Sequence, residues 1–257
     1  MSYTIDVRHI DFHFQQQALF QDLSAMIREG EFCAVVGPNG SGKTTLLRCM
    51  AGLLSVSAGK VLVGQRDVRA YKPMELARQI AFVPQHQDTI FDVTAHDMVM
   101  MGRNPYQKRW QVYSEEDEHI VMQMMSRCHV EHFADRSISA LSGGELQRTL
   151  IARAMAQQAP IMLLDEPLSN LDVSHQFEIM DILSQLNGEV GTTVVIVIHD
   201  FSMAIQYART ALLMRAGHIL AHDAVNVALT PELLRNCFQL VDSLQITEHG
   251  EVHKIKM

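Results

Sequence analysis

The stretch "GPNGSGKTT" (37–45) follows directly on the apolar run "FCAVV" (32–36). Gly37, Gly42 and the pair Lys43–Thr44 complete the pattern G-x-x-x-x-G-K-[S/T]. The apolar run predicts a buried strand, and residues 42–54 predict a helix that begins at the glycines. Glycines let successive backbone N–H groups point inward, and a helix N-terminus adds partial positive charge. The stretch therefore predicts a loop that binds the phosphates of a nucleoside triphosphate.

The side chains of this loop have separate expected roles. Lys43 is expected to reach the β- and γ-phosphates, and the hydroxyl of Thr44 to bind Mg²⁺. The residues predicted to contact the nucleotide here are Gly37, Pro38, Asn39, Gly40, Ser41, Gly42, Lys43, Thr44 and Thr45.

A second acidic motif, "IMLLDE" (161–166), places two carboxylates at the end of an apolar run. We interpret the run as a buried strand that carries Asp165 to the phosphate loop, where it would bind Mg²⁺ indirectly. Glu166 follows and is expected to polarise the water that attacks the γ-phosphate. Adjacent acids can take different roles because neighbouring side chains of an extended strand point in opposite directions.

Continuous apolar runs alternate with helical segments along the chain. Runs without polar alternation are typical of parallel strands that are covered on both faces, so we expect an α/β P-loop NTPase fold with a parallel-sheet core. Residues 3–32 and 58–64 alternate more clearly and predict an antiparallel β subdomain at one edge. Residues 86–140 have helical spacing and predict an inserted helical subdomain. The remaining predicted strands of the core are 79–85, 159–167 and 192–200, with helices at 145–157 and 174–187.

The composition limits the classes of function. The 257 residues are 47% hydrophobic and carry 21 basic and 29 acidic side chains, a net charge of −8. An acidic chain argues against a nucleic-acid partner, which usually selects a basic surface. The sequence starts without a signal peptide, and its apolar runs are shorter than the ~20 residues of a membrane helix. We therefore expect a chain that does not cross a bilayer by itself.

The four cysteines show no C-x-x-C spacing and are expected to be reduced, buried thiols. Two histidine pairs, His129 with His132 and His218 with His222, have possible ligand spacing. No cluster of cysteines or carboxylates supports either pair, so we do not expect a structural metal site.

The motif "LSGGE" (141–145) distinguishes this chain from other P-loop proteins. Ser142, Gly143, Gly144 and Glu145 open a helix, which predicts a second anion-binding site. The motif is too far along the chain to belong to the first loop. Two separated phosphate-binding loops suggest that each loop serves a different nucleotide across an interface.

The sequence resembles the nucleotide-binding subunit of ATP-binding cassette (ABC) transporters over nearly its whole length. "LSGGE" matches the signature motif of that family, and the other motifs occur in the same order. Gln85 in "VPQ" resembles the Q-loop, Asp172 in "SNLD" the D-loop, and His199 in "VIHD" the switch histidine. The aromatic residue that stacks on adenine would be Phe14 in "FHF", with Phe12 as the alternative.

The resemblance implies a single ABC ATPase domain over residues 1–257. Residues 1–85 and 159–257 would form the RecA-like core with the β subdomain, and about 86–158 the helical subdomain. It implies ATP and Mg²⁺ as cofactors, with Thr44, Gln85 and Asp165 around the metal. Its catalytic residues would be Lys43, Gln85, Glu166 and His199.

The resemblance also implies partners. The family forms a head-to-tail homodimer in which Lys43 and Asp165 of one subunit face Ser142 and Gly144 of the other. Each γ-phosphate would complete the interface, so that ATP favours closure. Gln85 would link the site to the helical subdomain, which meets transmembrane permease subunits, and a periplasmic substrate-binding protein would act indirectly. This places the chain at the cytoplasmic face of a bacterial inner membrane.

The cargo is a less direct inference. Residues 93–106, 171–183 and 199–208 resemble cassettes of importers for iron–siderophore complexes, haem and cobalamin, with zinc and manganese importers as alternatives. A soluble ABC ATPase acting on DNA or ribosomes is the alternative from another class. Such proteins carry a long coiled coil or two cassettes, which this sequence lacks. A small-molecule P-loop kinase would not need "LSGGE".

Overall fold

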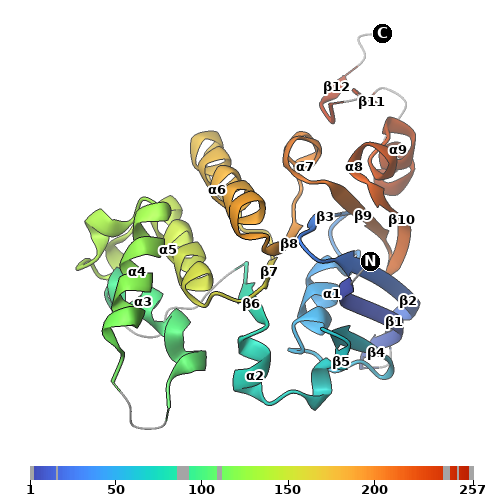
Figure 1. Ribbon diagram of the computed structural model, residues 1–257. Helices are drawn as coiled ribbons and strands as arrows, with labels where there is room; N and C mark the ends of the chain where they lie inside the picture. Colours follow the sequence, from blue (N-terminus) through green and yellow to red (C-terminus); the bar gives the residue numbers. More distant parts are fainter. Residues whose placement is uncertain are drawn as a thin grey trace. The chain divides into compact units, whose positions relative to one another are not determined.

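The computed structural model describes residues 3–15, 17–85, 93–108, 112–239, 244–247 and 249–254 (Figure 1). The chain divides into two compact units. The first combines Met1–Tyr71 with Thr193–Met257, and the second is Lys72–Thr192. The second unit is larger than the helical segment 86–158, because it also contains two strands and a long helix that flank that segment.

The first unit contains the antiparallel sheet that the alternating sequence predicts. In β2, Phe20, Leu23, Ala25 and Ile27 are buried and most of the residues between them are exposed, which is typical of a sheet with one solvated face. The strand order is β2-β1-β4-β5. The strands are β1 (Tyr3–Phe14), β2 (Gln17–Arg28), β4 (Ala58–Val63) and β5 (Arg66–Asp67).

The first unit also contains the parallel strands predicted from continuous apolar runs. β3 (Phe32–Val36) pairs in parallel with β8 (Thr193–Val197) and β9 (Thr210–Arg215). Every residue of β3 and β8 is buried, as expected for strands covered on both faces. β10 (His218–Ala224) returns antiparallel to β9 after a turn at Ala216 and Gly217.

Side chains cap α7 (Phe201–Tyr207) and α9 (Pro231–Phe238) of the first unit. At α9, Thr230 accepts a hydrogen bond from the Leu233 N–H, and Pro231 occupies the first turn, as is typical of a Thr-Pro start. The other elements are α1 (Lys43–Met50), the 3₁₀ turn η1 (Val68–Ala70), α8 (Val225–Ala228) and the hairpin β11 (Leu244–Ile246) and β12 (Val252–Lys254).

The second unit contains one parallel strand pair with helices before, between and after its strands. β6 (Ile80–Val83) and β7 (Ile161–Leu164) pair so that Val83 lies opposite Leu164. The polypeptide therefore leaves both strands at the same edge of the pair, the carboxyl edge. The helical elements are α2 (Pro73–Ala77), α3 (Ala95–Met100), η2 (Met101–Tyr106), α4 (Glu115–Arg127), η3 (Glu131–Phe133), η4 (Ile138–Ala140), α5 (Gly143–Ala156), α6 (Val173–Gln185) and the π-helical turn η5 (Leu186–Val190).

The segment predicted as a helical insertion is helical where it is described. α4 begins at Ser114 with a capping box to Asp117, and its first turn is acidic. Within the described parts of 86–140 the β-type pairing is a single bridge between Thr94 and Ser137, while 86–92 and 109–111 lie outside the described residues. The methionines that fill the core of this unit include Met98, Met100, Met124, Met125 and Met155.

All four cysteines are buried and unbridged, which confirms the prediction of reduced thiols. Among the described residues, no helix is long and apolar enough to cross a membrane.

Candidate nucleotide-binding site

The predicted phosphate loop lies in the first unit, between β3 and α1. The Lys43 side chain is 4% exposed, and its Nζ donates to the carbonyl oxygens of Gly37 at 2.8 Å and Pro38 at 3.0 Å. These bonds fold the loop around the ammonium group, so that the lysine lies along the loop. A buried ammonium held by carbonyls keeps its charge available for an incoming phosphate.

Two glycines of the loop cannot be replaced without moving the backbone. Gly42 has φ 102°, and a Cβ there would lie 2.6 Å from the Phe20 ring. A Cβ on Gly37 would lie 2.2 Å from the carbonyl oxygen of Met214. Both distances are far below ordinary contact. Glycine is therefore required at these two positions by the close approach of β2 and β9 as well as by the curl of the loop.

The entrance to α1 suits an anion. The first turn of α1 carries no acidic residue, so no carboxylate of this helix neutralises its N-terminal dipole. Ser41 is 2% exposed, and its Oγ has no hydrogen-bond partner among the residues that the structure describes. A buried unsatisfied hydroxyl costs about 1–3 kcal/mol. A bound phosphate oxygen would remove that cost, which agrees with the predicted function of the loop.

The two candidate adenine-stacking rings differ in exposure. Phe14 ends β1 and is 54% exposed, whereas Phe12 is 7% exposed. Phe12 packs edge-on against Phe14 with ring centroids 5.0 Å apart and lies 6.1 Å from Phe20. Phe12 is thus part of the core, and Phe14 is the ring whose face a base could cover.

His199 also belongs to the first unit. It follows β8 and is exposed, directly before Asp200, which caps α7 by accepting a hydrogen bond from the Met203 N–H at 3.0 Å. The buried strand and the capped helix fix the backbone on both sides of His199.

In the second unit, the parallel strands β6 and β7 bring two predicted site residues together. The Gln85 Nε2 donates to the Glu166 Oε2 at 2.6 Å. Each residue lies two positions beyond the end of its strand, and the strand ends are paired. Asp165 is fully buried, and its N–H donates to the Val83 carbonyl at 2.9 Å. The side chain of Gln85 can therefore hold or release the carboxylate of Glu166.

The backbone at Glu166 differs from the sequence interpretation. Strand alternation was expected to separate Asp165 from Glu166, but β7 ends at Leu164 and Glu166 has φ 49°. A left-handed backbone at a residue with a side chain costs of order 1–3 kcal/mol. The separation of the two acids thus comes from a strained turn and not from the pleat of a strand. Such strain is frequent at functional sites.

The "LSGGE" motif opens α5 with a capping box. Ser142 Oγ accepts from the Glu145 N–H at 3.3 Å, and Glu145 Oε2 accepts from the Ser142 N–H at 2.7 Å. The backbone hydrogen bond from Ser142 is the main reason why the pKa of Glu145 lies below its usual range. The carboxylate therefore already satisfies one backbone donor of this helix N-terminus, while Gly143 beside it is exposed.

His175 is a residue of this region that the sequence reasoning missed. Its Nδ1 lies 2.6 Å from the Asp172 Oδ1, and Asp172 caps α6 by accepting from the His175 N–H at 3.0 Å. These bonds, the backbone one first, lower the pKa of Asp172. A Cβ on Gly144 would lie 2.8 Å from the His175 ring. The signature glycine and the D-loop aspartate thus meet at one histidine. A capping aspartate three residues before a histidine is the only local signal.

The predicted residues thus fall into two groups, each within one unit. The phosphate loop, Phe14 and His199 belong to the first unit, and Gln85, Asp165, Glu166 and Asp172 belong to the second together with the "LSGGE" motif.

The comparison with known protein families agrees with this set of motifs. The family model described as "ABC transporter" matches residues 20–169.

Two curated relatives are similar in sequence. The cobalamin import ATP-binding protein BtuD of Halobacterium salinarum is 40% identical over 235 residues, which cover 91% of this chain and 58% of the relative. The chain therefore spans little more than half the length of that relative. The ferric enterobactin transport ATP-binding protein FepC of Escherichia coli K12 is 39% identical over 86% of this chain and 81% of its own length.

Solved structures share the fold. A metal-chelate type ABC transporter in an inward-facing conformation matches with a TM-score of 0.83 at 29% identity, over 98% of this chain and 96% of the matched chain. A dimeric ATP-binding cassette in a post-hydrolysis state, bound to ADP and Pi, matches with a TM-score of 0.76 at 28% identity, over 86% and 98% of the two chains.

Proposed function

The chain belongs to the ABC transporter family, and from this premise we propose that it is the ATP-hydrolysing subunit of a bacterial importer. The phosphate loop is the observation that carries the proposal. Gly37 and Gly42 admit no Cβ, Lys43 is buried against the carbonyls of the loop, and Ser41 is a buried donor without a partner in the described structure.

For the cargo, we propose a ferric siderophore, haem or a related iron chelate. The support comes from the relatives, one of which is named for ferric enterobactin transport and another for cobalamin import. Cobalamin, zinc and manganese remain the alternatives.

The roles that we propose for residues of the first unit are those that the family resemblance implies. The backbone N–H groups of residues 37–45 and the N-terminus of α1 hold the phosphates, and Lys43 neutralises the β- and γ-phosphate oxygens. Phe14 stacks on the adenine. His199 contacts the γ-phosphate and orients the attacking water.

The proposed roles of the second unit concern water activation and Mg²⁺. Glu166 accepts a proton from the attacking water, and Gln85 positions the carboxylate of Glu166 through the hydrogen bond between the two side chains. The donors proposed for Mg²⁺ are the oxygens of Thr44, Gln85 and Asp165. Hard oxygen ligands suit this ion, and the fully buried Asp165 is a carboxylate of the kind that benefits from a nearby cation. When bound, Mg²⁺ supplies charge neutralisation at the phosphate oxygens.

The proposed assembly is a head-to-tail homodimer. Ser142, Gly143, Gly144 and Glu145 of one copy would contact the γ-phosphate held by the other, with Asp172 at the same interface. Solved cassettes of this fold include dimers, which supports the proposal. The dimer would bind transmembrane permease subunits at the cytoplasmic face of the inner membrane, and a periplasmic substrate-binding protein would deliver the cargo.

Mixing variants tests the shared site. Lys43→Ala and Ser142→Arg each damage both sites of a homodimer, but a mixed dimer regenerates one site without a lesion. Mixing Lys43→Ala with Glu166→Gln is the matched control, because both residues act from the same copy and no intact site can form. We expect ATP turnover to return in the first mixture alone. Equal turnover in both mixtures would contradict the proposed dimer.

Two further tests address the catalytic base and the importer role. Glu166→Gln should bind ATP as the wild type does and hydrolyse it at a rate reduced about a hundredfold or more, since a general base contributes about 10²–10⁴-fold. The wild-type chain should co-purify with a multi-span membrane protein. Co-purification with ribosomes or DNA instead would support the soluble alternative.

A further inference from the structure

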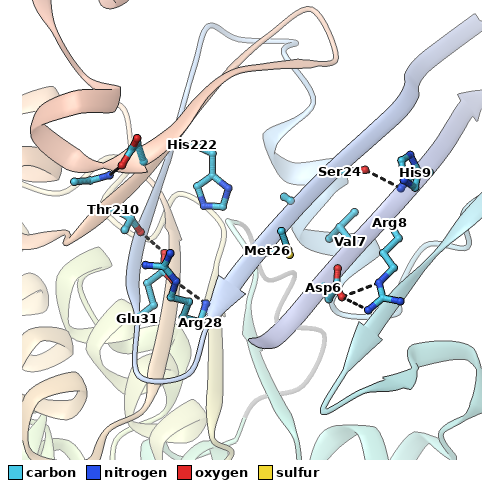
Figure 2. A pocket seen from close by; sticks show the side chains of 13 residues that line it. Asp6, Val7, Arg8, His9, Ser24, Met26, Arg28, Glu31, Thr210 and His222 are labelled. Carbon is cyan, nitrogen blue, oxygen red and sulfur yellow. Dashed lines mark hydrogen bonds and ion pairs between the residues drawn. The ribbon is translucent and has the colours of Figure 1, made fainter. Parts of the chain in front are cut away.

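A cavity of about 670 Å³ lies in the first unit, on the face that β1, β2, β9 and β10 share (Figure 2). It is separate from the phosphate loop. The loop follows the carboxyl end of β3, whereas Glu31 in the cavity wall precedes the amino end of the same strand. The five residues of β3 put roughly 15 Å between these two ends at the usual rise per residue. Nothing in the proposed ATP chemistry uses this cavity.

Three possible metal ligands of different chemistry meet beside it: Glu31 and His222 line the cavity, and Cys33 is fully buried next to them. A carboxylate oxygen of Glu31, the Sγ of Cys33 and a ring nitrogen of His222 all lie within 4.8 Å of one another. Glu31 and Cys33 are two residues apart in extended backbone, so their side chains point to the same face. His222 comes from β10, on the far side of β9, and points into the cavity in Figure 2.

The carboxylate is held in place by neighbours that leave it free coordination sites. Glu31 is 8% exposed and accepts a hydrogen bond from the Arg28 N–H at 2.7 Å and another from the Thr210 hydroxyl. A carboxylate has about four lone-pair sites, so two remain. Ligands of bound metals are usually fixed by such outer hydrogen bonds.

The other two groups differ: the Cys33 thiol must lose its proton to bind a metal, whereas the His222 ring needs no such change. Cys33 is fully buried, and burial first, then the charge of Glu31, raises the pKa of its thiol to about 12. The His222 ring makes no hydrogen bond within the part of the chain that the structure describes. Burial lowers the pKa of His222, so its imidazole is neutral at pH 7 and carries a free lone pair.

We propose that Glu31, Cys33 and His222 bind one thiophilic divalent cation of the Zn²⁺ type, with the cavity supplying the fourth coordination position. Three protein ligands of mixed S, N and O character with an open position are the donor set of accessible zinc sites. Tetrahedral zinc places such ligand atoms about 3.3–3.6 Å apart, so the three atoms, which lie within 4.8 Å of one another, must close by at most about 1.5 Å. Rotation of the His222 side chain, which no hydrogen bond holds in the described part of the chain, can supply that movement.

Binding includes one proton transfer. The S–H bond of Cys33 breaks, a sulfur–metal bond forms with the sulfur lone pair, and the proton leaves to solvent through the cavity. No electron is transferred. The metal would also neutralise the buried Glu31 carboxylate.

Cobalt binding tests the proposal, because a thiolate ligand to Co²⁺ gives a charge-transfer absorption that carboxylates and imidazoles do not. The untagged, full-length, nucleotide-free protein is titrated with Co²⁺ and then with Zn²⁺. We expect one Co²⁺ per chain with a charge-transfer band that Zn²⁺ abolishes. Cys33→Ser should lose the band, and Glu31→Gln or His222→Gln should weaken Co²⁺ binding by about tenfold or more.

Two variants are controls. His9→Gln removes another histidine of the same cavity wall, and Cys49→Ser removes another buried thiol, so both should bind Co²⁺ as the wild type does. His222 is only half-buried, so its variant decides the question even where Cys33→Ser does not fold. Absence of the band in the wild type, persistence of the band in folded Cys33→Ser, or unchanged affinity in His222→Gln would each overturn the proposal.

Discussion

The adjacent glycines Gly143 and Gly144 should respond in opposite ways to the same substitution. In Gly143→Ala the new Cβ would meet Leu171 at 4.0 Å, which is ordinary contact. In Gly144→Ala it would meet the His175 ring at 2.8 Å. Both glycines lie in the first turn of α5 and neither has a positive φ, so replacing them with alanine brings a similar gain in helix propensity of up to about 1 kcal/mol.

The difference between the two variants therefore isolates the contact with His175. Overpacking of this kind costs about 1–3 kcal/mol. His175 is partly exposed and can turn away, but its ring then leaves the carboxylate of Asp172, a contact that solvent screens. Because His175 can turn away, we expect Gly144→Ala to be less stable than Gly143→Ala by about 1 kcal/mol in the free energy of unfolding, the low end of that range.

Urea unfolding of the nucleotide-free protein measures this difference. In a His175→Ala background the gap between the two glycine variants should close, because the ring that the new methyl group meets is gone. Equal stability of Gly143→Ala and Gly144→Ala, or a gap that survives in the His175→Ala background, would refute the reasoning.

Three further predictions concern single side chains. Phe14→Ala should weaken ATP binding about tenfold or more by loss of stacking, with little loss of stability. Phe12→Ala should instead destabilise the fold by about 3–5 kcal/mol. Isothermal titration measures the effect on ATP binding, and urea unfolding measures the effect on stability. Ala216→Gly should raise the free energy of unfolding by about 0.5–1 kcal/mol, because Ala216 has φ 46°, and thermal unfolding measures it. Burial raises the pKa of Asp117, but hydrogen bonds from Arg103 and from the helix cap outweigh burial and bring this pKa to about 2. The ionised carboxylate therefore contributes about 2 kcal/mol to the free energy of unfolding above its unfolded pKa of about 4, and this contribution is lost as the pH falls from 4 to 2. Asp117→Asn should remove that acid dependence, which unfolding measured against pH would show.

The features that were predictable from the sequence are local ones. The phosphate loop is a single stretch in which strand, glycines and helix follow one another. The caps at Ser114 and Thr230 each depend on hydrogen bonds within three residues. The strand β3 was recognisable because burial on both faces demands an unbroken apolar run.

The contacts that define the site more finely depend on distant segments. The bond between Gln85 and Glu166 follows from the register of β6 and β7, which the hydrophobic pattern of either strand leaves open. Phe12 and Phe14 lie on the same face of an alternating strand, and only packing against Phe20 shows which ring is covered.

The sequence by itself determined that the chain has a phosphate loop, a capped signature helix and a parallel α/β core, because these follow from backbone chemistry and periodicity within short stretches. Only the tertiary structure decided that Gly144 meets His175 and that Cys33 and Glu31 meet His222. Those groups are brought together by strand pairing and helix packing between segments far apart in the chain, and side-chain distances of that kind leave no periodic trace in the sequence.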